Sequence, residues 1–438
     1  MFNKRWLRVL ALLVFVPLGW FSIGQATRPI SAEAKSQYED IRLFTDVLSI
    51  VRKSYVEDVD MKDLIYGAIN GMLASLDPHS SFMPPDVYKE MKVDTRGEFG
   101  GLGIEITIKD GILTIVSPIE DTPAYRAGLQ AGDQIVKIEN RFTKDINIMD
   151  AVKLMRGPKG SKISITVMRE SFEKPREFLL VREIIKIHSV KSRTLEDGYG
   201  YVRLVQFQEP TSDELETALQ ELRKENNGSL KGLILDLRNN PGGLLEQAVK
   251  VSDTFLADGL IVYTDGREEG SRMEFSAHAK GTESDYPMAV LINGGSASAS
   301  EIVAGALQDH ERAIIIGTQS FGKGSVQTII PLSDDSGLRL TTARYYTPQG
   351  TSIQARGITP DIVVSQVEVK KAEDAEHFRE KDLKNHFETS DTNSEEAIDS
   401  DLQKFNLESD DRNDYQLMRA LDLLKGLQIF KNMKSPAA

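Results

Sequence analysis

The spacing of apolar residues changes several times along the chain, and each change marks a different kind of element. Between residue 37 and about residue 88, apolar side chains recur every three or four positions, which predicts amphipathic helices. The apolar face of the first predicted helix consists of Ile41, Phe44, Val47, Leu48 and Val51. The apolar face of the second consists of Leu64, Ile65, Ala68, Ile69 and Met72. Two such helices within residues 27–95 indicate a helical hairpin or a dimerisation arm. Packing of the pair on its own core is an equally good interpretation.

From Gly97 the period of the apolar residues falls to two, which is typical of strands. A glycine-rich loop and a strand come first, followed by a turn at Asp110 and Gly111 and a second strand. A short helix (124–127), a strand (134–138), a helix (148–155) and a closing strand (163–167) complete the pattern. The pattern therefore predicts a small α+β domain over residues 96–185.

Strands and helices then alternate over residues 186–364. The predicted strands are 199–204, 232–237, 288–292 and 313–316, and the predicted helices are 212–225, 244–254 and 300–309. Alternation of this kind favours an α/β core, a mixed sheet with crossover helices. More strand is expected near Gly337.

The carboxyl-terminal part of the chain differs from this core. Residues 365–411 are acidic and hydrophilic, which indicates a solvated linker. Residues 412–438 contain an amphipathic helix, whose leucines we expect to serve assembly: Leu417, Leu421, Leu424 and Leu427.

The amino terminus carries an export pattern. Lys4, Arg5 and Arg8 precede a stretch without charge at residues 9–24, which is nearer in length to a signal-peptide core than to a membrane span. Small residues at Gly24 and Ala26 suit a signal peptidase. We interpret residues 1–26 as a signal peptide cleaved after Ala26, or alternatively as an uncleaved anchor. Either interpretation predicts a periplasmic or otherwise exported protein with no other membrane span.

Length, charge and cysteine content exclude several classes of function. A chain of 438 residues suggests two to four structural units, and its formal charge of -13 argues against a nucleic-acid partner. The absence of cysteine removes disulfides, thiol nucleophiles and cysteine-ligated metals.

Residues 317–323 match the front of the P-loop pattern for phosphate binding. The pattern next requires Ser or Thr for magnesium, but Gly324 stands there, and a strand pattern follows where a helix is needed. We therefore expect no nucleotide, and no metal or other cofactor.

The stretch G-G-S-A-S-A-S-E-I presents Ser296, Ser298 and Ser300 just before a predicted helix. A nucleophilic serine needs a base, yet none of the six histidines stands in a pattern that pairs it with these serines. The pattern G-x-S-x-G is also missing. A buried lysine amine, with a lowered pKa, is the alternative base, and Lys323 between two glycines is a candidate.

N-G-G-S-A-S-A-S-E-I together with F-G-K-G-S-V-Q resembles the carboxyl-terminal processing proteases, also called tail-specific proteases. The resemblance covers roughly residues 38–364, including A-R-Y-Y-T-P near Gly350. It implies that Ser298 is the nucleophile and Lys323 the base of a Ser-Lys dyad. It further implies that Gln327 orients the lysine and that Glu301 supports the site.

Acyl transfer also needs two hydrogen-bond donors for the oxyanion. The backbone amide of Ala299, where a turn enters a helix, is one candidate. The resemblance points to the turn N-P-G-G for the second donor, where Gly242 and Gly243 remain alternatives.

The residues Gly101, Leu102, Gly103 and Ile104 resemble the carboxylate-binding loop of PDZ domains, Gly-Leu-Gly-Phe, with isoleucine in the last position. Backbone N–H groups of such a loop bind a free terminal carboxylate, and the adjoining strand pairs with an extended peptide. We expect the helix 148–155 to form the opposite wall of the groove, through Ala151 and Leu154 among others.

The sequence thus predicts an α/β catalytic core with an inserted PDZ domain and an N-terminal helical arm. The predicted function is an exported serine endopeptidase that recognises the carboxyl end of protein substrates. Expected partners are substrates with a free carboxyl terminus, further copies of the chain through its terminal helices, and an activating adaptor protein. The alternatives are a PDZ adaptor or chaperone of the cell envelope with an inactive core, and a histidine-based hydrolase.

Overall fold

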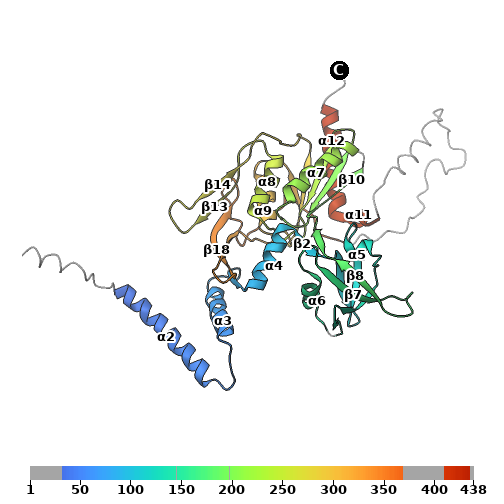
Figure 1. The fold of residues 1–438 in the computed structure, drawn as a ribbon. Coiled ribbons are helices and arrows are strands. Elements are labelled where there is room, and N and C mark those ends of the chain that lie inside the picture. Colours follow the sequence, from blue (N-terminus) through green and yellow to red (C-terminus); the bar gives the residue numbers. More distant parts are fainter. Residues whose placement is uncertain (1–31, 145, 197, 368–408, 435–438) are drawn as a thin grey trace, which may run out of the picture. The chain divides into compact units, whose positions relative to one another are not determined.

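The computed structural model describes residues 32–144, 146–196, 198–367 and 409–434 (Figure 1). The predicted signal segment, residues 1–26, and most of the predicted acidic linker lie outside the described residues. Between Pro78 and His79 the chain divides into an amino-terminal helical unit and a larger unit. Among the described helices, none combines the length and the hydrophobicity that crossing a bilayer requires.

The amino-terminal unit contains the two predicted helices, α2 (Ala32–Ser54) and α3 (Met61–Ala74). Asp60 caps α3, because its side chain accepts a hydrogen bond from the Lys62 amide at 2.6 Å. Within this unit α2 exposes Ile41 and Phe44, so the apolar face predicted for this helix is not buried there.

In the larger unit, the predicted α+β domain is an antiparallel sheet with strand order β3-β4-β5-β7-β8. Its strands are β3 (Ile104–Lys109), β4 (Ile112–Pro118), β5 (Gln134–Ile138), β7 (Lys162–Met168) and β8 (Arg176–Val181), with β6 (Arg141–Phe142) beside β5. The helices are α5 (Pro123–Arg126) and α6 (Ile148–Met155). A separate antiparallel pair, β2 (Glu98–Gly101) and β9 (Glu183–Lys186), stands where the chain enters and leaves the domain. Strand β7 alternates buried and partly exposed residues, as its sequence period predicts.

A six-stranded sheet of order β10-β11-β12-β15-β16-β19 forms the centre of the α/β core. Its strands are β10 (Val190–Glu196), β11 (Tyr199–Leu204), β12 (Gly232–Asp236), β15 (Met288–Ile292), β16 (Ile314–Gly317) and β19 (Ile362–Val363). All neighbours from β11 to β19 pair in parallel, and β10 pairs with β11 antiparallel. Parallel strands require crossovers, which is why helices separate most of them in the sequence.

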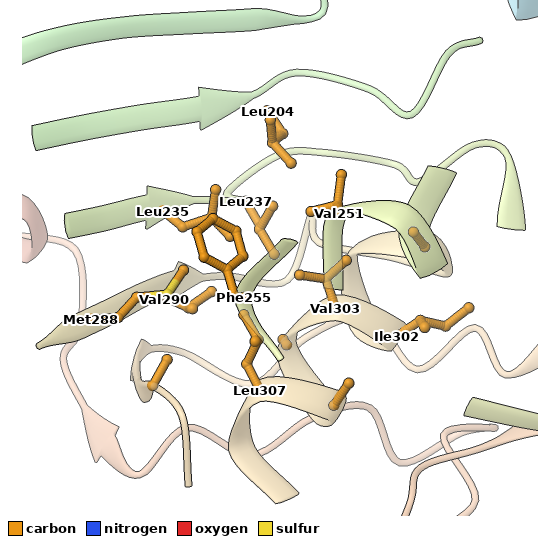
Figure 2. Close-up of a cluster of buried hydrophobic side chains, with 14 of the residues drawn as sticks. Leu204, Leu235, Leu237, Val251, Phe255, Met288, Val290, Ile302, Val303 and Leu307 are labelled. Carbon is orange, nitrogen blue, oxygen red and sulfur yellow. The ribbon is translucent and has the colours of Figure 1, made fainter. Parts of the chain in front are cut away.

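One face of this sheet is covered by α7 (Thr211–Glu225), α8 (Leu245–Phe255) and α9 (Ala299–Asp309). Figure 2 shows part of this cluster, with side chains of α8 and α9 against those of the sheet: Val251, Phe255, Ile302, Val303, Leu307, Leu235 and Val290. Because both faces of the central strands are covered, β12 and β15 are buried at every position.

A second sheet also belongs to the larger unit. Its strands are β1 (Ser81–Met83), β18 (Gly337–Tyr346), β13 (Leu260–Gly266) and β14 (Met273–Ser276), with β17 (Ser325–Pro331) also paired to β18. The helix α4 (Pro85–Arg96) follows β1.

The carboxyl-terminal helices are α11 (Ser409–Asn413) and α12 (Tyr415–Lys434). Leu417, Leu421 and Leu424 of α12 are buried with Ile234 and Leu291 on the other face of the central sheet. The prediction that these three leucines serve assembly is therefore wrong, because they cover strands that would otherwise expose apolar side chains to water. Of the four predicted leucines, only Leu427 is exposed.

Candidate active site

Ser298 lies where the turn after β15 enters α9, at the helix N-cap. Its backbone has φ 56° and ψ -112°, a region that residues other than glycine rarely occupy. Gly242 packs directly against it, since a Cβ atom at Gly242 would lie 2.9 Å from the Cβ of Ser298. The serine is thus held in a strained turn by close backbone packing, which is typical of functional sites.

The three serines of this turn have different surroundings. The Ser296 hydroxyl donates to the carbonyl of Leu237 at 2.8 Å, and the Ser300 hydroxyl donates to the carbonyl of Asn240 at 2.9 Å. Both residues are fully buried, whereas Ser298 lines a large cleft. Ser296 and Ser300 therefore join two turns of the backbone, and Ser298 alone of the three faces the cleft.

Glu301 is fully buried in the first turn of α9 and accepts four hydrogen bonds through its carboxylate. One comes from the Ser298 amide at 2.7 Å. The others come from the Ser320 hydroxyl at 2.6 Å, the Gly322 amide at 2.6 Å and the Lys323 amide at 2.9 Å. A single carboxylate therefore ties the turn that carries Ser298 to the loop that carries Lys323.

Lys323 lies on the loop between β16 and β17, and its side chain lines the same cleft as Ser298. Burial lowers the pKa of the Lys323 amine below its ordinary value, and the nearby Arg339 guanidinium lowers it further. Glu301 acts in the opposite direction and raises this pKa. The net lowering favours the neutral amine, the form that accepts a proton.

Gln327 is on β17 and also lines the cleft. Its side-chain amide donates to the carbonyl of Ser325 at 3.1 Å and to the Ser325 hydroxyl at 2.8 Å. In the described part of the chain, the Lys323 amine makes no hydrogen bond with Gln327 or with Ser298. The structure thus brings the three residues to one cleft, while the orienting role of Gln327 stays a prediction.

The cleft has a volume of about 1060 Å³ and is formed by several elements of the larger unit. Its lining includes residues to which sequence analysis assigns no function: Val87, Glu90, Met91, Asp94 and Thr95 of α4, and Arg339 and Tyr345 of β18. Burial raises the pKa of Tyr345 to about 12, although a hydrogen bond with Ser298 acts to lower it. The phenol beside the serine is therefore neutral at physiological pH.

The turn after β12 contains both candidate glycines for the oxyanion site. The Gly242 amide donates to the Asn240 side chain at 2.9 Å, so this N–H group is already bonded. Among the described residues, neither the Gly243 amide nor the Ala299 amide has an acceptor. Gly243 has φ +148°, and a Cβ atom there would lie 2.1 Å from the carbonyl oxygen of Phe207, which leaves room only for glycine.

The glycine-rich loop of the α+β domain borders a small pocket of about 130 Å³. Gly101, Leu102, Gly103 and Ile104 line this pocket, together with Phe99, Ile106, Val152, Met155 and Arg156. Within the described chain, the amides of Leu102 and Gly103 have no hydrogen-bond acceptor. Gly103 has φ +74°, and a Cβ atom there would lie 2.3 Å from Thr122, so the loop requires glycine at this position.

The expected role of two α6 residues in this pocket is wrong. Ala151 is fully buried in the core of the domain, and Leu154 packs against that core. Val152 and Met155 of the same helix line the pocket instead. The helix contributes the predicted wall, but through a different part of its circumference.

The four histidines that the structure describes do not line the cleft. His188 contacts Glu214 at 3.0 Å, and His310 contacts the carbonyl of Leu260 at 2.7 Å. The remaining two, His377 and His386, lie outside the described residues.

Three family models match the chain. Peptidase family S41 matches residues 198–364, the PDZ domain matches residues 114–169, and the activating protease CtpB N-terminal domain matches residues 21–87. The first match contains Ser298, Lys323 and the turn with Gly242 and Gly243.

Whole-chain comparison gives relatives of similar length. A carboxy-terminal-processing protease of Bartonella bacilliformis is 49% identical over 394 residues, which cover 90% of each chain. A carboxyl-terminal-processing protease of Synechocystis is 40% identical over 333 residues, which cover 74% of this chain and 77% of the relative. Among solved structures, a photosystem II D1 C-terminal processing protease is 32% identical with a TM-score of 0.44, covering 74% of this chain and 92% of the other.

Replacement of Glu301 by glutamine tests the bridge between the two turns. In the Glu301→Gln variant, an NH₂ group replaces one of the two oxygens that accept hydrogen bonds in the wild type. Some donors then face another donor, so the free energy of unfolding should fall by about 2–5 kcal/mol. Peptidase activity should fall by about a hundredfold or more, because the two side chains lose their common anchor. Urea unfolding and the rate of peptide cleavage measure the two effects.

Glu311, exposed just beyond the same helix, provides the matched control. We expect Glu311→Gln to change neither quantity. Wild-type cleavage rates in the Glu301→Gln variant would contradict the structural role given to this carboxylate.

Proposed function

The chain belongs to the carboxy-terminal-processing protease family of serine-type peptidases, and we propose that it is an exported endopeptidase with a Ser-Lys dyad that selects substrates by their carboxyl ends. The observation that carries the dyad is the buried Glu301 carboxylate, which bonds the backbone of Ser298 and of Lys323 at once. It fixes the two residues relative to each other in one cleft.

In the first step, Ser298 Oγ attacks the carbonyl carbon of the scissile peptide bond while its proton passes to the neutral Lys323 amine. The lowered pKa of Lys323 supports this role, because burial and the Arg339 guanidinium both disfavour a second positive charge in the cleft. The carbonyl oxygen becomes an oxyanion. Two backbone amides without other acceptors, those of Ala299 and Gly243, are the donors we assign to it.

Collapse of the tetrahedral intermediate breaks the peptide C–N bond. The Lys323 ammonium gives its proton to the leaving amine, and Ser298 is left as an ester of the new carboxyl end. Lys323 then takes a proton from water as the water oxygen attacks the ester carbon. When that second intermediate collapses, the Ser298 oxygen regains a proton from the lysine, and the acid product leaves.

Between the two glycines, the structure favours Gly243. The Gly242 amide already donates a hydrogen bond to Asn240, whereas the Gly243 amide has no acceptor among the described residues. Gly242 contributes instead by packing closely against Ser298. Gln327 remains the proposed partner of the lysine amine, reached by a rotation of its side chain away from Ser325.

Substrate selection is assigned to the PDZ domain. The loop from Gly101 to Ile104 offers free amides beside an apolar pocket, which suits a terminal carboxylate and its last side chain. The exposed edge of β3 would pair with the extended peptide.

The amino-terminal part of the chain supports two further proposals, on the location of the enzyme and on its association. The basic and apolar pattern of residues 1–26 supports export, to the periplasm or an equivalent compartment, with or without an amino-terminal anchor. The exposed apolar face of α2 supports association of copies through the amino-terminal helices. An activating adaptor remains a prediction, as does gating by movement of the PDZ domain.

The dyad is tested by single replacements in the exported chain. Ser298→Ala and Lys323→Ala should each lower kcat on an unfolded protein substrate by about a thousandfold or more, since either change removes the nucleophile or its base. Ser229→Ala and Lys224→Ala, at exposed positions of the core, serve as controls and should leave kcat unchanged. If the protein were instead an envelope adaptor with an inactive core, the wild-type protein would not cleave the substrate. The Ser298→Ala replacement would then leave the cleavage rate unchanged.

Carboxyl-end selection is tested with paired peptides that differ only in a free or an amidated terminus. We expect kcat/KM to be about tenfold or more higher for the free acid, the equivalent of about 1.4 kcal/mol. Gly103→Ala should abolish this preference, because its Cβ would displace Thr122 and distort the loop.

Gly111, in the β3–β4 turn, also has a positive φ but no neighbour near its Cβ position, so Gly111→Ala is the matched control. It should keep the preference for the free acid. Equal rates on the two peptides with the wild-type enzyme would refute carboxylate capture.

A further inference from the structure

Two segments far apart in the sequence meet at the end of β12. Arg238, in the turn that carries Gly242 and Gly243, donates from Nη1 and Nη2 to the two carboxylate oxygens of Asp414 at 2.9 and 2.6 Å. Nη1 also donates to Oε1 of Gln416 at 3.0 Å. Asp414 precedes α12, so the carboxyl-terminal segment reaches the turn directly.

The Arg238 guanidinium is fully bonded in this position. Its Nε and Nη2 donate to Asp236 at 2.7–3.1 Å, and Asp236 also accepts from the Tyr201 hydroxyl at 2.7 Å. All five N–H groups of an arginine side chain thus have partners among Asp236, Asp414 and Gln416. Because Asp236 and Gln416 are almost completely buried, the side chain has one orientation.

The backbone on both sides of Arg238 is bonded to the turn of the catalytic serine. The carbonyl of Leu237 accepts from the Ser296 hydroxyl at 2.8 Å. The carbonyl of Asn240 accepts from the Ala297 amide at 3.0 Å and from the Ser300 hydroxyl at 2.9 Å. A shift of Arg238 would therefore move both turns that supply the proposed oxyanion donors.

Asp414 is itself held in place. Its carboxylate accepts from the Leu417 amide at 3.1 Å, which caps α12. Gln416 donates to the carbonyl of Val364 at 2.7 Å, and Leu417 and Leu421 are buried against the sheet. Burial acts to raise the pKa of Asp414, but the hydrogen bonds and the positive charge of Arg238, together with hydrogen bonds from the Gln416 and Leu417 backbone, lower the pKa overall, so the carboxylate is charged.

We propose that Asp414 is a positioning residue of the active site: through Arg238 it fixes the turn that presents the Gly243 amide to the oxyanion. The carboxyl-terminal segment would then complete the peptidase core after the acidic linker, rather than serve only as a docked or assembling helix. The inference rests on the proposed oxyanion donors and adds a residue 176 positions beyond Arg238 to their support.

A second ion pair in the same segment supplies a matched control. Asp411 pairs with Arg193, whose Nε donates to Asp411 Oδ2 at 3.0 Å. Arg193 belongs to β10 at the far edge of the sheet from β15. The Asp411 carboxylate therefore helps to dock the terminal segment, and among the described residues its hydrogen bonds come from Arg193 and not from Arg238.

The experiment compares Asp414→Asn with Asp411→Asn in the full chain. Kinetics on a peptide substrate give kcat and KM, and inhibition by a short peptide boronic acid reports on the oxyanion site, because its adduct with Ser298 places an oxygen there. Asp414→Asn should lower kcat and the boronate affinity by about tenfold or more while KM changes by less than about twofold. Asp411→Asn should leave all three unchanged, although urea unfolding should show a similar loss of stability.

Gln416→Met provides a second variant of the same contact and should lower kcat in the same direction, by a smaller factor. Equal losses of kcat in Asp414→Asn and Asp411→Asn would overturn the inference, since docking alone would then explain them. Wild-type boronate affinity in Asp414→Asn, with binding abolished in Ser298→Ala, would overturn it while the dyad stands. Equal boronate affinity of the wild type and Ser298→Ala would overturn the dyad and this inference together.

Discussion

One buried carboxylate determines the geometry of this peptidase site. Glu301 has no access to solvent, and its two oxygens accept hydrogen bonds from the backbone of Ser298, the side chain of Ser320 and the backbone of Gly322 and Lys323. Such a charge is costly to bury unless every bond is made, so the two turns have little freedom to separate. Ser298 and Lys323, the proposed nucleophile and base, reach one cleft because their backbones share this anchor, and not because their side chains attract each other.

The same constraint explains why the surrounding backbone is so tightly specified. Ser298 adopts a positive φ at the start of α9, which persists only where neighbouring contacts impose it. Gly242 supplies one of these contacts by packing against the serine, and Asn240 supplies another by accepting from the Ser300 hydroxyl. The two flanking serines, which the sequence alone does not distinguish from a nucleophile, serve this packing. Arg238 and Asp414 extend the network to the carboxyl-terminal helix.

Much of the core could be predicted from the sequence, because buried parallel strands and their crossover helices leave strong apolar patterns. The predicted bounds of β11 and β15 agree with the structure, and short motifs predict that Ser298 and Lys323 belong to one site, in keeping with the cleft that both residues line. Contacts between distant segments leave no such pattern. Nothing in the local sequence relates Asp414 to Arg238, or brings α4 and Arg339 to the cleft. The error at Ala151 and Leu154 has a related cause: α6 is apolar on more than one side, so periodicity does not show which side meets the groove and which the core.

The pKa of the Lys323 amine tests the account most directly, and it can be measured by following the Cε signal of ¹³C-labelled lysine during a pH titration, with Lys323→Arg to assign the signal. The account predicts a midpoint below the ordinary value of 10.5, because burial and Arg339 disfavour the ammonium. Arg339→Gln should move that midpoint upward, since removing a positive charge favours protonation. A midpoint at or above 10.5 in the wild-type protein would contradict the proposal that this cleft lowers the pKa of the amine so that Lys323 can act as the base.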